Sequence, residues 1–379
     1  MVNYKYLTIV NWSKRYIEEN HMSTGDKFFS EAELCEIHNV SRQTVRQALA
    51  VLEQKSLLVK KRGSGTYIQK FKNNHSNTIP MVGVILTFFN NYIFPEIISG
   101  IEQEISNNNF ALQLYSTHNS VSEEARALEA ILAQNIEGVI VEPSKSGLPN
   151  SNELLYQSIR ESGIPLLFLN TKYPFIDFPV ICMDNVEAGR IATEHLVSLG
   201  HKKISLFLDF EDYQAHQRYR GYTDCLIAHN IPFDEKLVLW YPFKEWDNMF
   251  TTMSERILYL LENSTGIVCY NDMLAVLLIE FCKQKSIRVP DDLSIVGIDD
   301  SNLAASCVVP LSSVKHPKQK LGKKAAEFLL HMIQSGSLGE DGFLFRPTLV
   351  ARESTSVPKR TLHYMEDSSN RDIIQSPRS

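Results

Sequence analysis

The sequence predicts a small helical domain with a two-stranded hairpin, followed by a larger α/β body with parallel sheets. Apolar residues recur at helical spacing in the first part of the chain and then give way to a glycine-containing hairpin pattern. From residue 81 onward, short continuous apolar runs alternate with helix-length amphipathic segments. A length of 379 residues is also long for one hydrophobic core, so two or three domains are expected.

The formal net charge of −6 is unevenly distributed along the chain. Residues 1 to 70 contain eleven basic and seven acidic side chains, whereas the remaining residues carry a formal charge of −10. A basic first segment on an acidic body favours a nucleic-acid partner at that end, although a solvated surface would have the same charge.

The six cysteines are scattered, without a C-x-x-C pair or clustered histidines, so neither a zinc site nor a disulfide framework is expected. No metal ion and no cofactor is predicted. The N-terminus lacks an apolar signal region, and no stretch approaches the ~20 apolar residues of a membrane-spanning helix. We therefore expect a cytoplasmic protein.

Three helices and a hairpin are predicted in the first domain. Residues 4 to 19 have the apolar spacing of a helix. Residues 31 to 38 form a second helix, with Ser30 as N-cap and Glu33 three positions later in a capping box. A third helix follows after a brief turn, and residues 57 to 68 then form a hairpin that turns at its glycines. This order of elements is typical of a winged helix-turn-helix.

The third predicted helix follows Ser41, a good N-cap because its hydroxyl can accept a hydrogen bond from an amide of the first turn. One set of positions forms a buried stripe: Val40, Val45, Leu49 and Leu52. The positions expected to be exposed near the helix start are Arg42, Thr44, Arg46 and Gln47. A helix with these residues at its start is typical of those that enter the major groove of DNA.

The first domain, residues 5 to 68, resembles the winged helix of the GntR family. The matching pattern consists of Gly25-Asp26-Lys27, Ser30-Glu31-x-Glu33-Leu34, Val40-Ser41-Arg42-x-Thr44-Val45-Arg46-x-Ala48-Leu49 and Gly63-x-Gly65-Thr66-Tyr67. The resemblance implies base-edge reading by Arg42 and Arg46, and wing contacts by Arg62 and Gly63. An arginine fork matches the paired acceptors of guanine.

The same resemblance implies that Ser41, Thr44 and Glu31 contact the DNA backbone or orient the arginines. The alternative is that the arginines of the third helix and of the wing are solvated surface charges. The wing glycines favour DNA contact, because they let the backbone approach phosphate closely.

The body contains eight predicted strands, at residues 82–86, 111–115, 138–141, 165–169, 180–183, 203–208, 266–270 and 293–298. Ligands of parallel sheets bind beyond the carboxyl ends of the strands. The candidate binding residues are therefore Phe88, Asn90, Tyr92, Glu142, Asn170, Asp184, Asn271 and Asp299. The predicted domain boundaries are 1–69 for the winged helix, 70–80 for a linker, 81–357 for the body and 358–379 for a disordered tail.

The body resembles the effector-binding domain of the lactose and galactose repressor family, itself similar to periplasmic sugar-binding proteins. The motifs are Asp184-Asn185 with Gly189, His195-Leu196-x-x-Leu199-Gly200-His201, Arg218-x-x-Gly221-Tyr222, Tyr270-Asn271-Asp272-x-x-Ala275, Val289-Pro290-Asp291-Asp292, Val296-Gly297-Ile298-Asp299-Asp300 and Pro310-Leu311-Ser312-Ser313-Val314. The resemblance implies two doubly wound α/β lobes, crossed by the chain three times, with the ligand in the cleft. The first lobe would take residues 81 to about 178 and a late return near 315 to 340.

The same resemblance implies roles in sugar binding for individual residues. Arg218 would bind sugar hydroxyls, and Asp299 would accept hydrogen bonds from two adjacent hydroxyls. Asn271 would act similarly after its strand, and Asn170 occupies the equivalent place in the first lobe.

Local runs at residues 90–98, 139–146 and 148–150 resemble the arabinose-responsive repressors of Gram-positive bacteria, which join the same two domain types. This closer resemblance implies that Glu142 faces a pentose from the end of its strand. Tyr92, in the first of these runs, is a further candidate effector contact.

Several effector candidates have a structural alternative. Trp246 aligns with an aromatic residue that packs on the apolar face of the sugar, and Trp240 is a rival for that role. Arg218 could instead pair with a surface carboxylate on its helix, and Glu142 could be a surface carboxylate near Lys145.

Helix capping, core packing and structural hydrogen bonding compete with ligand binding at a further group of residues. Asp299, Asp300 and Asn271 could cap the segments that follow them, and for Asp272 the capping role is favoured. The aromatic side chains that could pack in the core or between lobes are Phe88, Phe89, Tyr92 and Phe94. Three histidines are expected to be hydrogen-bonded structural residues, because none has a metal-ligand partner at suitable spacing: His195, His201 and His216.

The two resemblances together predict a homodimeric transcriptional repressor that holds two operator half-sites and is released by a small sugar, L-arabinose. Sugar binding would favour closed lobes and lower the affinity for DNA. The protein is not expected to be an enzyme. The alternatives are a response to another sugar or a nucleoside, a sugar-binding protein of the transport class, and a PLP-dependent enzyme fused to a DNA reader. No lysine is marked as a desolvated Schiff-base residue.

Overall fold

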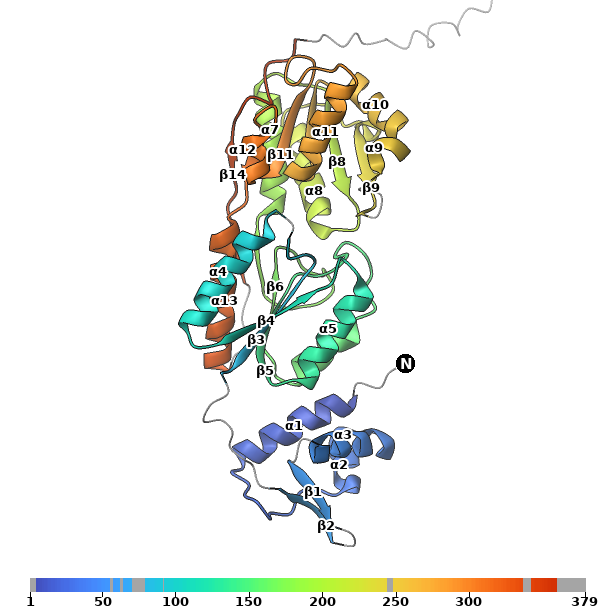
Figure 1. Cartoon of the computed structure of the whole chain (residues 1–379). Coiled ribbons are helices and arrows are strands. Elements are labelled where there is room, and N and C mark those ends of the chain that lie inside the picture. Colours follow the sequence, from blue (N-terminus) through green and yellow to red (C-terminus); the bar gives the residue numbers. More distant parts are fainter. Residues whose placement is uncertain are drawn as a thin grey trace, which may run out of the picture. The chain divides into compact units, whose positions relative to one another are not determined.

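The computed structural model describes residues 5–54, 57–61, 64–69, 79–90, 92–243, 248–336 and 342–359 (Figure 1). Several predicted features lie outside the described residues: Arg62, Gly63, Trp246, residues 70–78 of the linker and residues 360–379 of the tail. The chain divides into two compact units, of which the first comprises residues 1–184, 211–214 and 317–346, and the second comprises residues 185–210, 215–316 and 347–379.

The N-terminal elements form a winged helix-turn-helix, which confirms the first part of the predicted fold class. They are α1 (Lys5–Glu19), α2 (Glu31–His38), α3 (Arg42–Gln54), β1 (Leu58–Lys61) and β2 (Gly65–Ile68). The capping box of α2 is present: the Ser30 hydroxyl accepts from the Glu33 N–H at 3.3 Å, and the Glu33 carboxylate accepts from the Ser30 N–H at 2.7 Å. Leu34, Val45 and Leu52 are fully buried where the helices meet.

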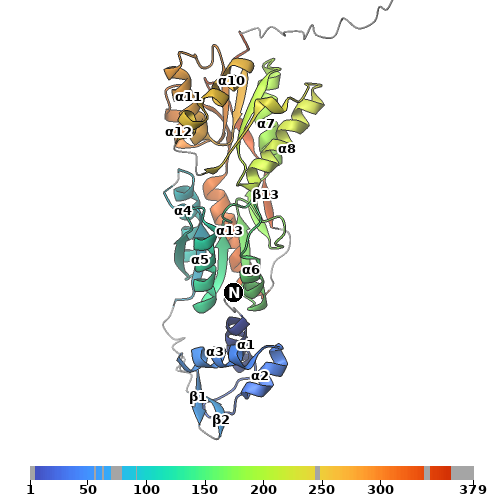
Figure 2. The same ribbon diagram turned by 90° about the vertical axis from the view of Figure 1, so that its right-hand side faces the viewer.

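The remainder of the first unit is built on a six-stranded parallel sheet of order β13-β7-β6-β5-β3-β4. Its strands are β3 (Met81–Leu86), β4 (Ala111–Ser116), β5 (Ile136–Val141), β6 (Leu166–Leu169), β7 (Val180–Met183) and β13 (Phe343–Phe345). Helices α4 (Phe94–Asn107) and α13 (Lys318–Ser335) pack on one face, and α5 (Val121–Ala133) and α6 (Glu153–Glu161) pack on the other (Figures 1 and 2).

The second unit contains another six-stranded sheet, of order β14-β12-β11-β10-β8-β9, in which β14 alone runs antiparallel to its neighbour. Its strands are β8 (Ile204–Asp209), β9 (Val238–Tyr241), β10 (Gly266–Cys269), β11 (Ser294–Asp299), β12 (Ser312–Lys315) and β14 (Thr348–Val350).

Helices cover both faces of this second sheet as well (Figure 2). Helices α7 (Asn185–Ser198) and α8 (Tyr213–Ala228) lie on one side, and α10 (Ser254–Asn263) and α11 (Asp272–Gln284) pack on the other. The smaller helical elements are η2 (Glu235–Leu237), α9 (Met249–Thr252) and α12 (Asn302–Ser306). Both units are therefore doubly wound, which confirms the predicted class of the body.

All eight predicted strands are present, with ends that differ from the predicted ranges by a few residues. The apolar pattern does not predict β9, β12, β13 or β14, which are only three or four residues long. Short length alone does not explain this, since β6, β7 and β10 are also four residues long and are predicted. No helix in the described part of the chain is long and apolar enough to cross a membrane.

Candidate functional site

The start of α3 is organised by Ser41 and Thr44. The Ser41 hydroxyl oxygen accepts from the backbone N–H of Thr44 at 3.3 Å and lies 2.9 Å from the Thr44 hydroxyl. Ser41 is therefore the N-cap of α3, as predicted. Thr44 is only 2% exposed, so the prediction of an exposed side chain at this position is wrong. Its hydroxyl turns back to the cap, and the residue supports the helix start from the inner face.

Glu31, at the start of α2, holds one basic side chain from α3 and another from β1. Nε of Arg46 donates to one carboxylate oxygen at 3.0 Å, and Nζ of Lys60 donates to the other at 2.6 Å. Lys60, followed by Arg46, lowers the pKa of Glu31. This is the contact that an orienting role for Glu31 requires. Lys60 was not among the predicted residues, although the basic run that ends β1 was a signal for it.

The basic side chains of α3 and β1 are exposed. Arg42 is exposed, and the Arg46 side chain has 68% of its surface accessible. Lys61, which ends β1, lies with its ammonium nitrogen 4.8 Å from the centroid of the Tyr67 ring on β2. Solvated charges of this kind are available to phosphate or to base edges, so this face is a candidate nucleic-acid interface.

Glu142 directly follows β5 and is buried. Its Oε2 accepts from the backbone N–H and the hydroxyl of Thr87, at 3.1 and 2.5 Å, and its Oε1 accepts from Nδ2 of Asn170 at 2.8 Å. Burial raises the pKa of Glu142 to about 7, although these hydrogen bonds favour the charged form. The surface alternative is therefore wrong, and Lys145 pairs with Glu211 at 2.6 Å instead.

Asn170 follows β6 and is 2% exposed. Its φ of 61° is in the left-handed region, which asparagine tolerates better than most residues. Its amide nitrogen donates to Glu142, but its Oδ1 is buried and has no hydrogen-bond partner among the described residues. A buried acceptor without a partner costs ~1–3 kcal/mol, so this oxygen marks a place where a ligand hydroxyl could donate.

Arg218 of α8 supplies a buried positive charge to the second unit, because it is only 2% exposed. Its Nε donates to Oδ1 of Asn185 at 3.1 Å, and its Nη1 donates to the carbonyl oxygen of Tyr270 at 2.5 Å. The guanidinium carbon also lies 4.8 Å from the centroid of the Tyr270 ring. A surface ion pair is therefore the wrong interpretation of Arg218. The guanidinium is held at the end of β10, because Tyr270 directly follows that strand.

Asn271 follows Tyr270 and is the N-cap of α11, where its Oδ1 accepts from the Leu274 N–H at 2.9 Å. The side-chain oxygen of Asn271 therefore has the capping role, and its amide nitrogen can donate to a ligand. The capping role favoured for Asp272 is wrong. Asp272 is fully buried, and its carboxylate accepts from the N–H and hydroxyl of Ser301 and from the hydroxyl of Ser313. Burial, and then the nearby Asp299, raises the pKa of Asp272.

Asp299 ends β11 and is 4% exposed. The parallel register places Val268 opposite Val296, so Asn271 and Asp299 each lie three residues beyond this pair, at the carboxyl ends of neighbouring strands. The φ angle of Asp299 is 124°, a conformation that costs a residue other than glycine ~1–3 kcal/mol and is concentrated at functional sites. The N-cap of α12 is Ser301, so capping does not describe Asp299.

The remaining candidates are less well defined. Tyr92 is half-buried between β3 and α4, whereas Phe94 belongs to the core. Trp240, the rival of Trp246, stacks on His216 with ring centroids 5.1 Å apart. The three histidines expected to be structural are hydrogen-bonded to the following partners: His195 to Thr355, His201 to Thr265 and Ser356, and His216 to the carbonyl of Phe210.

The residues that hold the candidates in place were not predicted from the sequence. Thr87 follows β3 directly and binds Glu142, and Asn185 and Tyr270 hold Arg218. Asn185 and Tyr270 belong to motifs of the body, but they lie 33 and 52 positions from Arg218 in the sequence. Such pairings depend on the tertiary fold.

Two family models match the chain. Residues 6–68 match the bacterial regulatory proteins of the gntR family, and residues 193–355 match a periplasmic binding protein-like domain. Among solved structures, transcription regulator CcpA of Lactococcus lactis is 25% identical, with a TM-score of 0.66, over 74% of this chain and 100% of that chain. These matches agree with the two parts of the fold.

Curated relatives extend the similarity over nearly the whole chain. The arabinose metabolism transcriptional repressor of Geobacillus stearothermophilus is 35% identical over 93% of this chain and 97% of its own length. The repressor of the same name from Halalkalibacterium halodurans is 34% identical over 94% of this chain and 97% of its own length. The chain therefore belongs to the family of the arabinose metabolism transcriptional repressors, which are DNA-binding regulators rather than enzymes.

Proposed function

We propose that this chain forms a homodimer that binds operator DNA through α3 and the wing and releases it when L-arabinose binds. One observation carries the effector half: buried polar groups follow the strands of both sheets, and the Oδ1 of Asn170 is a buried acceptor without a partner among the described residues. The names of the two relatives support arabinose as the sugar. Because its partner is chromosomal DNA, we infer that the protein acts in the cytoplasm.

In the DNA-binding half, Arg42 and Arg46 read base edges, and Arg62 and Gly63 contact the DNA at the wing. The exposure of the two helix arginines supports these roles. The remaining proposed contributors act indirectly or on the backbone: Ser41 at the helix start, Thr44 behind it and Glu31 beside Arg46. Each base-reading arginine would supply ~1–3 kcal/mol of discrimination.

In the effector-binding half, Arg218 and the amide of Asn271 donate to sugar hydroxyls, whereas Asp299 and Asn170 accept from them. Glu142 holds Asn170 through the bond to its amide nitrogen. Two aromatic residues are proposed to pack on the sugar: Tyr92 and Trp246. The set combines fixed donors and acceptors, which is what recognition of a polyhydroxylated ligand needs.

The link between the two halves is a difference in affinity. Sugar that binds one conformation of the repressor better than another shifts the population toward that conformation, which binds operator less well. Thermodynamic reciprocity then requires that operator DNA weaken sugar binding by the same factor. The two half-sites of the operator would be related by the two-fold axis of the dimer.

The test is a gel shift of the full-length protein on DNA from upstream of its own gene, titrated with L-arabinose, D-xylose, D-ribose, D-glucose and adenosine. We expect L-arabinose to release the DNA at the lowest concentration. Release by another sugar or by adenosine would keep the repressor and change its effector. Release by none, or sugar affinity unchanged by saturating operator, would contradict the mechanism.

A further inference from the structure

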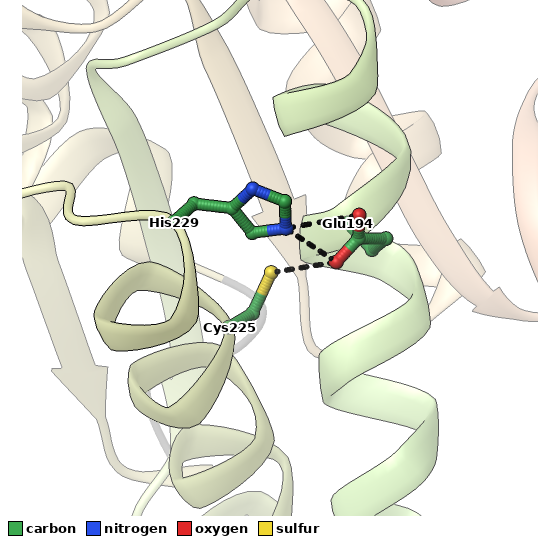
Figure 3. A group of neighbouring side chains, drawn as sticks. All are labelled: Glu194, Cys225 and His229. Carbon is green, nitrogen blue, oxygen red and sulfur yellow. Dashed lines mark hydrogen bonds and ion pairs between the residues drawn. The ribbon is translucent and has the colours of Figure 1, made fainter.

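Three side chains that commonly ligate metal ions lie together in the second unit (Figure 3). Glu194 projects from α7, and Cys225 and His229 project from α8 and its C-terminal end. Sγ of Cys225 lies 3.5 Å from Oε2 of Glu194, and Nε2 of His229 lies 2.9 and 3.0 Å from the two carboxylate oxygens. One ligand atom from each residue can be chosen so that all three lie within 4.8 Å of one another.

The local structure explains why these side chains meet. Cys225 and His229 are four residues apart at the end of one helix, so they share a face of α8. Helices α7 and α8 also approach each other closely, since a Cβ atom on Gly221 would lie 1.9 Å from the carbonyl oxygen of Val186. Ligands carried by two helices in close backbone contact are held in place better than ligands on loops.

We propose that Glu194, Cys225 and His229 bind Zn²⁺, with water as the fourth ligand. Thiolate, imidazole and carboxylate together form a donor set that zinc accepts in tetrahedral geometry. Zinc–ligand distances of ~2.0–2.3 Å place tetrahedral ligand atoms ~3.3–3.6 Å apart. The sulfur and a carboxylate oxygen already have this separation. The imidazole nitrogen would move a few tenths of an ångström away from the oxygen, and it would move toward the sulfur, which lies within 4.8 Å of it.

Accessibility and charge fit the same ion. The side chains of Glu194 and His229 are 37% and 38% exposed, whereas Cys225 is buried, so water can reach the fourth position from one side. A bound cation displaces the thiol proton to solvent, and the thiolate and carboxylate then neutralise the two positive charges of the ion.

The neighbouring guanidinium of Arg190 does not occupy the site. Nη1 of Arg190 lies 3.7 Å from Oε2 of Glu194. The same guanidinium donates through Nε and Nη2 to the two carboxylate oxygens of Glu187, each at 2.7 Å. Glu194 can therefore turn to a metal ion while Arg190 keeps its bidentate partner.

The experiment uses the full-length protein, stripped with a chelator and dialysed, and measures Zn²⁺ binding by competition with a chromophoric chelator. Co²⁺ is added separately, because a thiolate ligand gives it a charge-transfer absorption band. The test variants are His229→Gln and Glu194→Gln, whose side chains are partly exposed, together with Cys225→Ser for the Co²⁺ band. Matched controls are His331→Gln, an exposed histidine on α13, and Cys307→Ser, a partly buried thiol.

We expect one tightly bound Zn²⁺ per chain and at least ~100-fold weaker binding in His229→Gln and Glu194→Gln, since even losing an outer-shell partner costs ~10- to 100-fold. The controls should bind as the unchanged protein does. Absence of a one-to-one site, or equal Zn²⁺ affinity in the two ligand variants, would overturn the proposal. Persistence of the Co²⁺ band in Cys225→Ser would also overturn it, because another thiol would then be the ligand.

Discussion

Replacing Arg218 by methionine should produce a repressor that binds operator DNA normally and needs far more sugar to release it. The guanidinium is buried and fixed by Asn185 and by the carbonyl of Tyr270, so it is a rigid donor. A hydrogen bond from a charged donor contributes ~1.5–3 kcal/mol. Loss of one such bond to the sugar raises the concentration for half-release by ~10- to 150-fold. Methionine retains much of the apolar length of arginine.

The assay is fluorescence anisotropy of labelled operator, first titrated with protein and then released with sugar. Arg220→Met is a matched control, because Arg220 is on the same helix, its side chain is 75% exposed, and its Nε lies 3.7 Å from Asp224. That variant should release like the unchanged protein. If Arg218→Met binds operator normally and has the same release midpoint as the control, Arg218 does not contact the effector and the reasoning fails.

Three further outcomes are expected. Arg46→Ala should reduce the difference in binding free energy between operator and scrambled DNA by ~1–3 kcal/mol in anisotropy titrations. Arg126→Ala, at another exposed helix arginine, should leave that difference unchanged. Glu142 has a pKa of about 7 rather than 4.5, so the folded protein loses stability as pH rises between these values, by up to ~3 kcal/mol. The stability of Glu142→Gln relative to the unchanged protein should therefore increase with pH, and a pH-independent difference in denaturant titrations would contradict this. Gly221→Ala should lower the thermal unfolding temperature, because overpacking costs ~1–3 kcal/mol where α7 and α8 touch.

Glu142 shows how much of the effector site could be predicted from the sequence. Its place after a predicted strand marked it as a candidate, because the ends of parallel strands share one edge of the sheet. The nearby Lys145 also fits a surface ion pair with this carboxylate. The structure decides between them through Glu211, which is 66 residues from Lys145 and takes that ammonium group. Pairing at such a separation leaves no local pattern in the sequence.

Thr44 and β12 show two other limits. Thr44 occupies a helical position that the apolar stripe leaves outside, but its hydrogen bond to Ser41 and its burial place it on the inner face. In β12, Ser312 and Ser313 are fully buried and form hydrogen bonds with residues elsewhere in the second unit. Polar residues that are satisfied inside a sheet resemble a loop when only their hydropathy is considered.

The Oδ1 of Asn170, which has no partner among the described residues, has a consequence for selectivity. A ligand without a donor at this point would fill the space and leave the Asn170 oxygen without a hydrogen bond. The free-energy cost of that unsatisfied acceptor exceeds the net contribution of the hydrogen bond to binding when it forms. Sites of this kind discriminate mainly by rejecting what lacks a hydroxyl, and they reject it more strongly than an apolar pocket rejects a missing methylene. The repressor would then be kept on its operator in the presence of deoxy sugars by an energetic penalty against the wrong molecule.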